Sequence, residues 1–272
     1  MCETQSSIHR IDSLDDPRVA CYRNLKDREL AGMGERFLAE GDLVVRRLLE
    51  SDYPVESVLL AERRAGEIAP LVSAGVSIYV APDRVVDSIV GFRFHLGVIA
   101  CGRRKPGPAL DEVAAKWSGP VTLVVLPEVT KLDNLGSLLR IAGAFGADAV
   151  ILGERCCDPF YREPIRVSMG AVFHLKLVRS RDLLADLRRL RERWGVQLVG
   201  SVLEGRAEPL AGAARPERLA LLFGNEAQGL GADCLALCDR RVTIPMKLGA
   251  DSLNVAVAAG VFLHYFTAES YL

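Results

Sequence analysis

Residues 244–260 read IPMKLGADSLNVAVAAG, and this stretch decides how the second half of the chain is interpreted. Ile244 and Pro245 end an apolar strand, a glycine-containing loop follows, and Ser252 stands where a helix cap is expected. Asn254 falls in the first helical turn, where asparagine is a poor helix former. The small residues at 256–260 predict a helix that packs closely against another surface. Read in isolation, the stretch fits a functional loop or an ordinary capped helix equally well.

A second polar stretch, KLDNLGSLLR at 131–140, follows an apolar strand predicted at 121–126. Asn134 is expected at the start of the next helix, which is a normal cap position. Arg140 lies six residues further along the same helix, so its side chain reaches a face near the helix start. A helix cap followed by a solvated arginine would give the same pattern.

A third polar stretch, LLFGNEAQGL at 221–230, follows a strand predicted at 218–224. Gly224 and Gly229 permit backbone to lie close to a ligand, and Asn225 and Glu226 offer hydrogen-bonding groups. The spacing is not the G-x-G-x-x-G pattern of dinucleotide-binding loops. An ordinary turn between a strand and a helix would use the same residue types.

The chain from residue 120 onward alternates strands with helices. The predicted strands are 121–126, 148–153, 174–178, 196–202, 218–224 and 239–246, and the predicted helices are 134–146, 181–194 and 252–269. Continuous apolar strands in such a series predict a parallel sheet covered by helices. Open parallel sheets bind ligands beyond the carboxyl ends of their strands, where all three polar stretches fall.

A smaller α/β region precedes this series. Its predicted strands end at 37–38 and run through 55–60, 77–82 and 96–102, with helices beginning at Asp16 and at Gly41. The stretch GRRKPGPALDEVAAKWSGP at 102–120 then breaks the pattern with Gly and Pro. We therefore predict an N-terminal domain at 1–105, a linker at 106–119 and a second domain at 120–272.

Composition restricts the classes of function. A formal net charge of −1 means that any nucleic-acid contact depends on local basic groups, for which 103–105, Arg162 and Arg166 are candidates. The arginines at 188–193 share a predicted helix with Asp186 and Glu192, which favours a solvated helix face. No apolar run approaches the ~20 residues of a membrane helix. The seven cysteines and four histidines show no metal-ligand spacing, and the polar N-terminus predicts a cytoplasmic protein.

Together the three polar stretches resemble, in order and in wording, the motifs of the SpoU group of SPOUT RNA methyltransferases. Asn134, Gly136 and Arg140 match the first motif, and FGNEAQGL at 223–230 matches the second. The third is matched by IPM at 244–246 and by SLNVAVAAG at 252–260. The resemblance spans 121–266, and RVSMGAVFHL at 166–175 resembles a further family stretch. Residues 36–50 resemble, more loosely, the family's substrate-binding domain, which is related to kink-turn-binding ribosomal proteins.

The resemblance implies an α/β protein whose C-terminal SPOUT domain combines a parallel sheet with a deep trefoil knot. It implies methylation of a ribose 2′-hydroxyl in RNA from S-adenosylmethionine, with ribosomal RNA favoured over transfer RNA. A homodimer joined through the C-terminal domain is also expected, without metal or membrane. The implied cofactor-binding residues are Leu222, Phe223, Gly224, Asn225, Ile244, Met246, Ser252 and Leu253. The implied catalytic residues are Asn134, Arg140, Glu226, Ser252 and Asn254.

Two alternatives stay open at this point. A related chain without catalysis could act as an RNA-binding assembly factor, and failure to bind the cofactor would identify it. A SPOUT enzyme could also methylate a base, although the Ser-Leu-Asn of the third motif favours a ribose. For Arg140, the roles of base and of electrostatic stabiliser both remain possible, because a guanidinium normally stays protonated.

Overall fold

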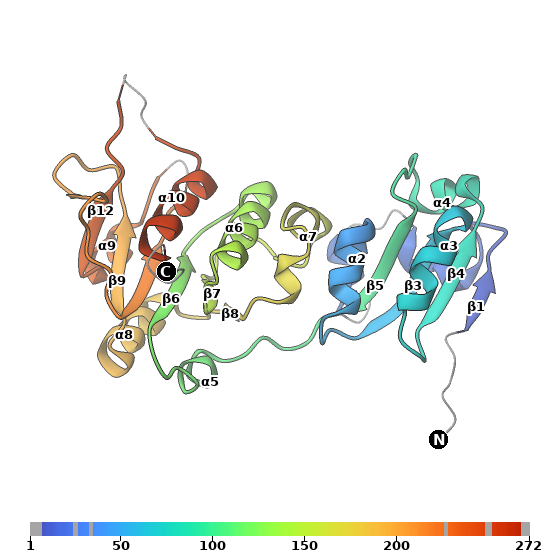
Figure 1. The fold of residues 1–272 in the computed structure, drawn as a ribbon, viewed down its shortest axis with the longest axis horizontal. Helices are drawn as coiled ribbons and strands as arrows, with labels where there is room; N and C mark the ends of the chain where they lie inside the picture. The colour runs from blue at the N-terminus through green and yellow to red at the C-terminus, as the bar shows by residue number, and fades with distance from the viewer. Residues whose placement is uncertain (1–6, 24–26, 33–34, 226–227, 248–251, 268–272) are drawn as a thin grey trace. The chain divides into compact units, whose positions relative to one another are not determined.

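The computed structural model describes residues 7–23, 27–32, 35–225, 228–247 and 252–267, and the chain divides into two compact units (Figure 1). Unit 1 combines Met1–Pro106 with Phe160–His174, and unit 2 combines Gly107–Pro159 with Leu175–Leu272. This division differs from the predicted domains in two places. Residues 107–119 belong to unit 2 rather than to a free linker, because Leu110 and Val113 are buried in its core. Residues 160–174 join unit 1.

Unit 1 is built on a five-stranded mixed sheet in the order β1-β4-β3-β5-β2. Its strands are β1 (Ile8–Arg10), β2 (Arg36–Glu40), β3 (Val55–Ala61), β4 (Ser77–Ala81) and β5 (Val98–Arg103). Strands β1, β4 and β3 are parallel, whereas β5 runs antiparallel to both β3 and β2. Its helices are η1 (Pro17–Tyr22), α1 (Asp27–Gly32), α2 (Asp42–Leu49), α3 (Glu62–Ile68), η2 (Ala69–Leu71), α4 (Asp83–Val90), α7 (Arg162–Val167) and η3 (Ala171–Phe173).

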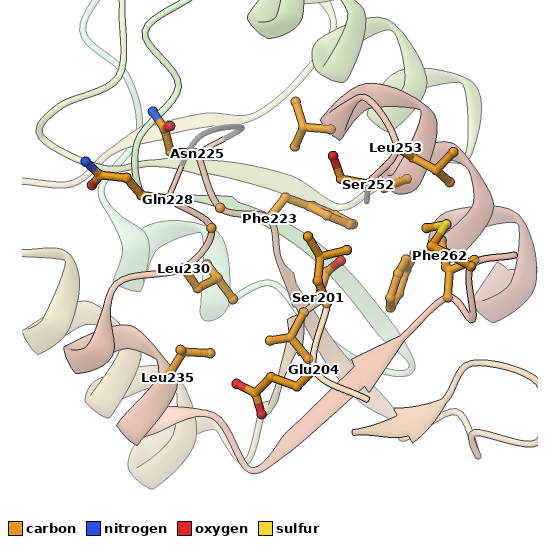
Figure 2. Close-up of a pocket in the computed structure, with 18 residues that line it drawn as sticks. Ser201, Glu204, Phe223, Asn225, Gln228, Leu230, Leu235, Ser252, Leu253 and Phe262 are labelled. Atoms are coloured by element: carbon orange, nitrogen blue, oxygen red, sulfur yellow. The ribbon is translucent and has the colours of Figure 1, made fainter. Parts of the chain in front are cut away.

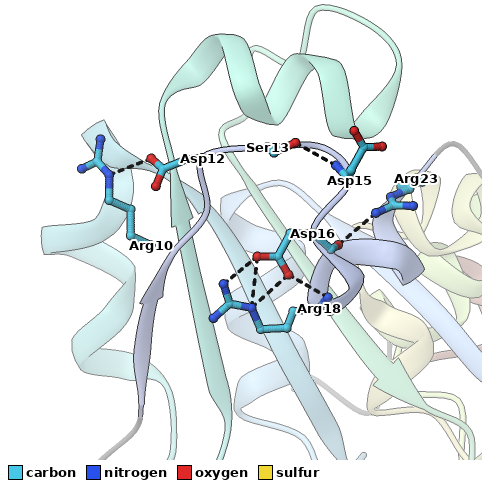
Figure 3. Close-up of polar contacts among 7 residues, drawn as sticks. All are labelled: Arg10, Asp12, Ser13, Asp15, Asp16, Arg18 and Arg23. Carbon is cyan, nitrogen blue, oxygen red and sulfur yellow. Dashed lines mark hydrogen bonds and ion pairs between the residues drawn. The ribbon is translucent and has the colours of Figure 1, made fainter.

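The helix predicted to begin at Asp16 does begin there, but it is a short 3-10 helix. The Asp16 carboxylate accepts the Arg18 backbone N–H at 2.9 Å and binds the Arg18 guanidinium at 2.6 Å (Figure 3). The Arg23 guanidinium donates to the Asp16 carbonyl at 3.0 Å. Helix η1 ends at the buried Tyr22, and α1 begins separately at Asp27, so the single helix expected from the sequence is two.

The segment 160–174 is held in unit 1 by aromatic packing and by an ion pair. The Phe37 ring lies 5.4 Å from Phe160 and 5.5 Å from Phe173, centroid to centroid. The Arg162 Nε donates to the Glu40 carboxylate at 2.5 Å, and both side chains are mostly buried. These contacts favour a structural role for Arg162 over the RNA contact considered from the sequence, whereas Arg166 is exposed.

Unit 2 is built on a seven-stranded sheet in the order β10-β12-β9-β11-β6-β7-β8, and every pair in it is parallel, as predicted. Its strands are β6 (Val121–Leu126), β7 (Ala149–Leu152), β8 (Leu177–Arg179), β9 (Gln197–Ser201), β10 (Glu208–Pro209), β11 (Arg218–Leu222) and β12 (Arg240–Thr243). Its helices are α5 (Leu110–Ala114), α6 (Leu132–Ala144), α8 (Leu183–Trp194), α9 (Ala232–Leu237) and α10 (Val255–Thr267).

Helices cover this parallel sheet. One core cluster joins α5, α8 and α9 to strand residues such as Leu123, Leu198 and Leu222. Helices α6 and α10 pack against each other, and Figure 1 shows them side by side. Gly260 lies at this contact, where an added Cβ would make an ordinary contact of 3.9 Å with the Ile141 side chain. The strand order brings the carboxyl ends of β12, β9, β11 and β6 into one row.

None of the helices in the described ranges has the length and hydropathy needed to cross a membrane. Within the same residues, His, Cys, Asp and Glu side chains form no group of three or more that could hold a metal ion.

Candidate active site

A cavity of about 450 Å³ lies beyond the carboxyl ends of the adjacent strands β12, β9 and β11 (Figure 2). Its described lining comes from four chain segments, which are 201–204, 223–225 with 228–230, Ile244 with Met246, and parts of 252–262. Leu235 of α9 completes the lining. Segments far apart in the sequence therefore meet here, because parallel strands deliver their following loops to one edge of the sheet.

Most of the cavity wall is apolar. Phe223 is buried, and its ring meets Phe262 of α10 edge to face with 5.8 Å between centroids. Leu230, Leu235, Val255 and Ala258 add further apolar surface. Polar side chains such as Ser201, Asn225 and Ser252 also line it, as Figure 2 shows. A concave apolar site with a few polar groups is typical of a site for a small organic ligand or cofactor.

The loop after β11 folds tightly on itself. Asn225 and Gly229 exchange two backbone hydrogen bonds of 3.0 and 2.7 Å. A Cβ at Gly224 would lie 2.1 Å from the Gly229 carbonyl carbon and 2.3 Å from the Leu230 nitrogen. Gly224 was expected to let backbone lie close to a ligand, and it lines the cavity. The space that a Cβ would take is filled by the loop's own backbone, and Gly229 supplies the positive φ of +67° that the turn requires.

The first and third polar stretches meet through two asparagines. The Asn254 Nδ2 donates to the Asn134 Oδ1 at 2.9 Å, across 120 residues of sequence. Asn134 is buried at 4% exposure, inside α6 rather than at its cap, since Lys131 precedes the first helical residue. The expectation of a cap at Asn134 is therefore wrong, and its side chain instead binds Asn254.

The cap of α10 is also reassigned. The Asn254 Oδ1 accepts the Ala256 N–H at 2.9 Å, and the Asn254 carbonyl accepts the Ala258 N–H at 2.9 Å. Asn254 therefore caps the helix, where asparagine is favoured, and Ser252 lies before it on the cavity wall. One side chain thus caps α10 with its oxygen and holds Asn134 with its nitrogen.

Arg140 projects from α6 and is exposed. Among the described residues it has no ion-pair or hydrogen-bond partner, and it is not part of the cavity lining. Glu226, also expected in the catalytic set, lies outside the described residues.

The predicted cofactor-binding residues fall into two groups. Those that line the cavity are Phe223, Gly224, Asn225, Ile244, Met246, Ser252 and Leu253. Leu222 does not line it. Its side chain is fully buried in the core cluster shared with α8 and α9, because alternate residues of a strand point to opposite faces.

Sequence reasoning missed the segment 201–204 at the end of β9. It carries no recognisable motif. The available signal was positional, since a strand in the middle of a parallel sheet presents its carboxyl end to the same edge as its neighbours.

Of the neighbouring cysteines, Cys156 is buried and Cys157 is partly buried. The Cys156 Sγ donates to the Leu126 carbonyl at 3.0 Å. Burial raises the pKa of Cys156 and raises that of Cys157 to about 11, so neither thiol is activated as a nucleophile.

Comparison with known proteins agrees with this arrangement. The sequence profile of the SpoU rRNA Methylase family matches residues 121–264. An uncharacterized tRNA/rRNA methyltransferase of Mycobacterium bovis is 38% identical over 94% of this chain and 91% of its own length. A 23S rRNA (guanosine(2553)-2′-O)-methyltransferase of Bacillus subtilis is 27% identical over 95% of this chain and 99% of its own.

Solved structures show the same relationship. The AdoMet-bound rRNA methyltransferase of Sinorhizobium meliloti superposes with a TM-score of 0.82 at 26% identity, covering 96% of this chain and 98% of the other. The extent of the profile match and the identity to the mycobacterial relative lead to one conclusion. The chain belongs to the SpoU rRNA methylase family.

Proposed function

We propose that this S-adenosylmethionine-dependent RNA methyltransferase methylates the 2′-hydroxyl of a ribose in ribosomal RNA. The observation that carries the proposal is the meeting of the second and third polar stretches at one cavity, with Asn254 of the third bound to Asn134 of the first. A 23S rRNA 2′-O-methyltransferase that aligns along nearly the whole chain supports the substrate.

The cavity fits the cofactor in size and in chemistry. Its apolar walls suit an adenine ring, and the backbone around Gly224 and Met246 offers hydrogen-bonding groups for the ring edge. We assign Phe223, Gly224, Asn225, Ile244, Met246, Ser252 and Leu253 to cofactor binding. When bound, S-adenosylmethionine supplies a methyl group activated by its cationic sulfur.

The chain's own residues must then position the ribose and stabilise charge. Methyl transfer to an alcohol removes a proton from the oxygen, which therefore gains negative charge. We assign Arg140 to electrostatic stabilisation of that oxygen, because its guanidinium stays protonated and is exposed without a described partner. Asn134 and Asn254 act as positioning residues, because their mutual hydrogen bond fixes the start of α10 against α6.

Unit 1 is proposed to bind the RNA, as expected from its resemblance to kink-turn-binding ribosomal proteins. The basic residues of 103–105 do not make this surface strongly positive. Arg103 pairs with Glu56, Arg104 lies 3.9 Å from Glu35, and Lys105 pairs with Asp52. RNA affinity should therefore depend on exposed cations elsewhere, of which Arg166 is one.

A homodimer is proposed through α10. Val257, Val261 and Tyr265 are 52%, 39% and 37% exposed, and their spacing of four residues places them on one helix face. An exposed apolar stripe of this kind is typical of a surface that another subunit covers.

A deep trefoil knot is proposed for the C-terminal region. Two features support it. The chain leaves β12 near one edge of the sheet, and Asn254 then bonds to Asn134, which follows β6 on the other side of β9 and β11. On the way it lines the same cavity as the loop after β11. An experimental structure in which these segments do not thread one through the other would contradict the knot.

The experiment for the function compares transfer of labelled methyl from S-adenosylmethionine to unmodified ribosomal RNA and to transfer RNA. We expect label in ribosomal RNA with the wild-type protein and none with Arg140→Ala, although the variant should bind the cofactor normally. Label confined to transfer RNA would contradict the proposed substrate. Full transfer by Arg140→Ala would contradict the role given to that side chain.

A further inference from the structure

One cavity residue is unexplained by the three motifs. Glu204, in the segment after β9, carries the single formal charge among the described residues that line the cavity. Its neighbour Leu203 lines the same wall and is 62% exposed (Figure 2 draws both, with Glu204 labelled). A large exposed apolar side chain on a cavity wall gains from burial when a ligand covers it.

Two backbone hydrogen bonds hold the segment that carries Glu204. The Val202 N–H donates to the Val242 carbonyl at 3.0 Å, and the Ala207 N–H donates to the Glu204 carbonyl at 3.0 Å. Arg241 of β12, which is outside the cavity lining, places its Nη1 3.4 Å from both carboxylate oxygens. A carboxylate offers about four acceptor positions, so this contact leaves capacity for two further donors.

Stability does not explain the pair of Glu204 and Arg241. Their side chains are 49% and 45% exposed, and ion pairs this exposed contribute little to folding. The carboxylate adds a negative charge to a cavity lining that otherwise has apolar walls and neutral polar groups.

The strand order indicates which part of the cofactor meets Glu204. Asn134, bonded to Asn254 and beside which we place methyl transfer, is in the helix that follows β6. Glu204 follows β9, and β11 lies between β9 and β6. Two strand spacings correspond to roughly 10 Å. Glu204 therefore faces the nucleoside half of the cofactor rather than the reacting sulfur. In that half of the cofactor, the ribose diol presents two adjacent O–H donors, which match the two oxygens of a carboxylate. The adenine edge instead presents a donor next to an acceptor, and a carboxylate can only accept, so the ribose is the better match.

We propose that Glu204 determines recognition of the cofactor ribose, accepting hydrogen bonds from its 2′- and 3′-hydroxyls, and that Leu203 covers the same nucleoside. The inference rests on the assignment of this cavity to the cofactor. Glu204 is a positioning residue in this account, since it holds the nucleoside from which the reactive end extends.

The test is calorimetric titration with S-adenosylhomocysteine and with its 3′-deoxyribose analogue. Glu204→Gln should weaken binding of the normal ligand about tenfold, because a charge-assisted hydrogen bond is lost. The wild type should bind the deoxy analogue about tenfold less tightly than the normal ligand, whereas Glu204→Gln should distinguish the two ligands far less. Arg241→Met is the matched control. It removes the same ion pair from outside the cavity and should change affinity much less than Glu204→Gln.

Three outcomes would overturn the inference. The first is that Glu204→Gln binds S-adenosylhomocysteine with normal affinity. The second is that the 3′-deoxyribose analogue binds more weakly than S-adenosylhomocysteine by the same factor in Glu204→Gln as in the wild type. The third is a loss in Arg241→Met that matches the loss in Glu204→Gln, which would assign the effect to the ion pair. Ala258→Phe places a large side chain in the cavity from α10. It tests whether the cofactor binds in this cavity at all, independently of the role proposed for Glu204. If Ala258→Phe still binds normally, the cofactor lies elsewhere and the proposed site is wrong.

Discussion

Replacing Gly224 by alanine tests the loop that closes the cavity. The added Cβ would lie 2.1, 2.3 and 2.4 Å from backbone atoms of Gly229 and Leu230, whereas ordinary contacts begin at 3.4 Å. Backbone cannot rotate away as a side chain can, so the loop must move by about 1 Å. That shift strains or breaks the two hydrogen bonds between Asn225 and Gly229.

The magnitude follows from these contacts. Overpacking costs about 1–3 kcal/mol, and two weakened hydrogen bonds add about 0.5 kcal/mol each. We expect Gly224→Ala to lose ~2–4 kcal/mol of unfolding free energy or, where only the loop rearranges, to bind the cofactor at least ~30-fold more weakly. Urea denaturation and calorimetric titration with S-adenosylhomocysteine measure the two quantities.

Gly231→Ala is the matched control for this substitution. Gly231 has nothing within 4 Å of an added Cβ and lacks a positive φ, so alanine should be tolerated. If Gly224→Ala were as stable as Gly231→Ala and bound the cofactor as tightly, the close packing of this loop would not matter, and the reasoning would be refuted.

Three further predictions concern other parts of the chain. Asn254→Ser keeps a good helix cap but loses the amide that holds Asn134, so turnover should fall about 10- to 100-fold while stability is nearly unchanged. Asn254→Ala also loses the cap, so it should lose ~1 kcal/mol of unfolding free energy in addition. Steady-state kinetics and thermal unfolding would show whether the two effects separate. Val261→Asp places a charge on the apolar stripe of α10 and should yield monomers in sedimentation velocity, and persistent dimers would exclude this face. The hydrogen bonds from the Arg18 side chain and backbone lower the pKa of Asp16 from 3.8 to about 2, so the contribution of Asp16 to stability is present above about pH 4 and is lost as the pH falls to about 2. Asp16→Asn should therefore be less stable than wild type at pH 7, and denaturation curves should show this difference shrinking between about pH 4 and about pH 2. A difference that stays constant with pH would contradict the pairing of Asp16 with Arg18.

The parallel sheet of unit 2 was predicted correctly from the sequence, whereas the caps of its helices α6 and α10 were not. Apolar strands separated by helices specify a parallel sheet, and the structure has it. The choice between Ser252 and Asn254 as the cap of α10 could not be made from the sequence, because both residues cap helices well. The contact between Asn254 and Asn134, formed only in the folded chain, explains which side chain the helix uses.

Contacts between distant segments account for what was missed. Nothing local marks 160–174 as part of unit 1, since its place depends on the packing of Phe160 and Phe173 against Phe37. Likewise, Glu204 reaches the cavity because β9 lies between β11 and β12, an order that the alternation of strands and helices does not specify. The three motifs were found because their glycine and asparagine patterns are local. Side chains placed only by strand order leave no such pattern.

The position of the transferred methyl group tests the central claim most directly. Ribosomal RNA labelled by this protein from S-adenosylmethionine should be hydrolysed with alkali, and the products should be separated by size. A methylated 2′-hydroxyl cannot attack the adjacent phosphate, so the account predicts label in alkali-resistant dinucleotides. Label recovered in mononucleotides would place the methyl group on a base and would contradict the account.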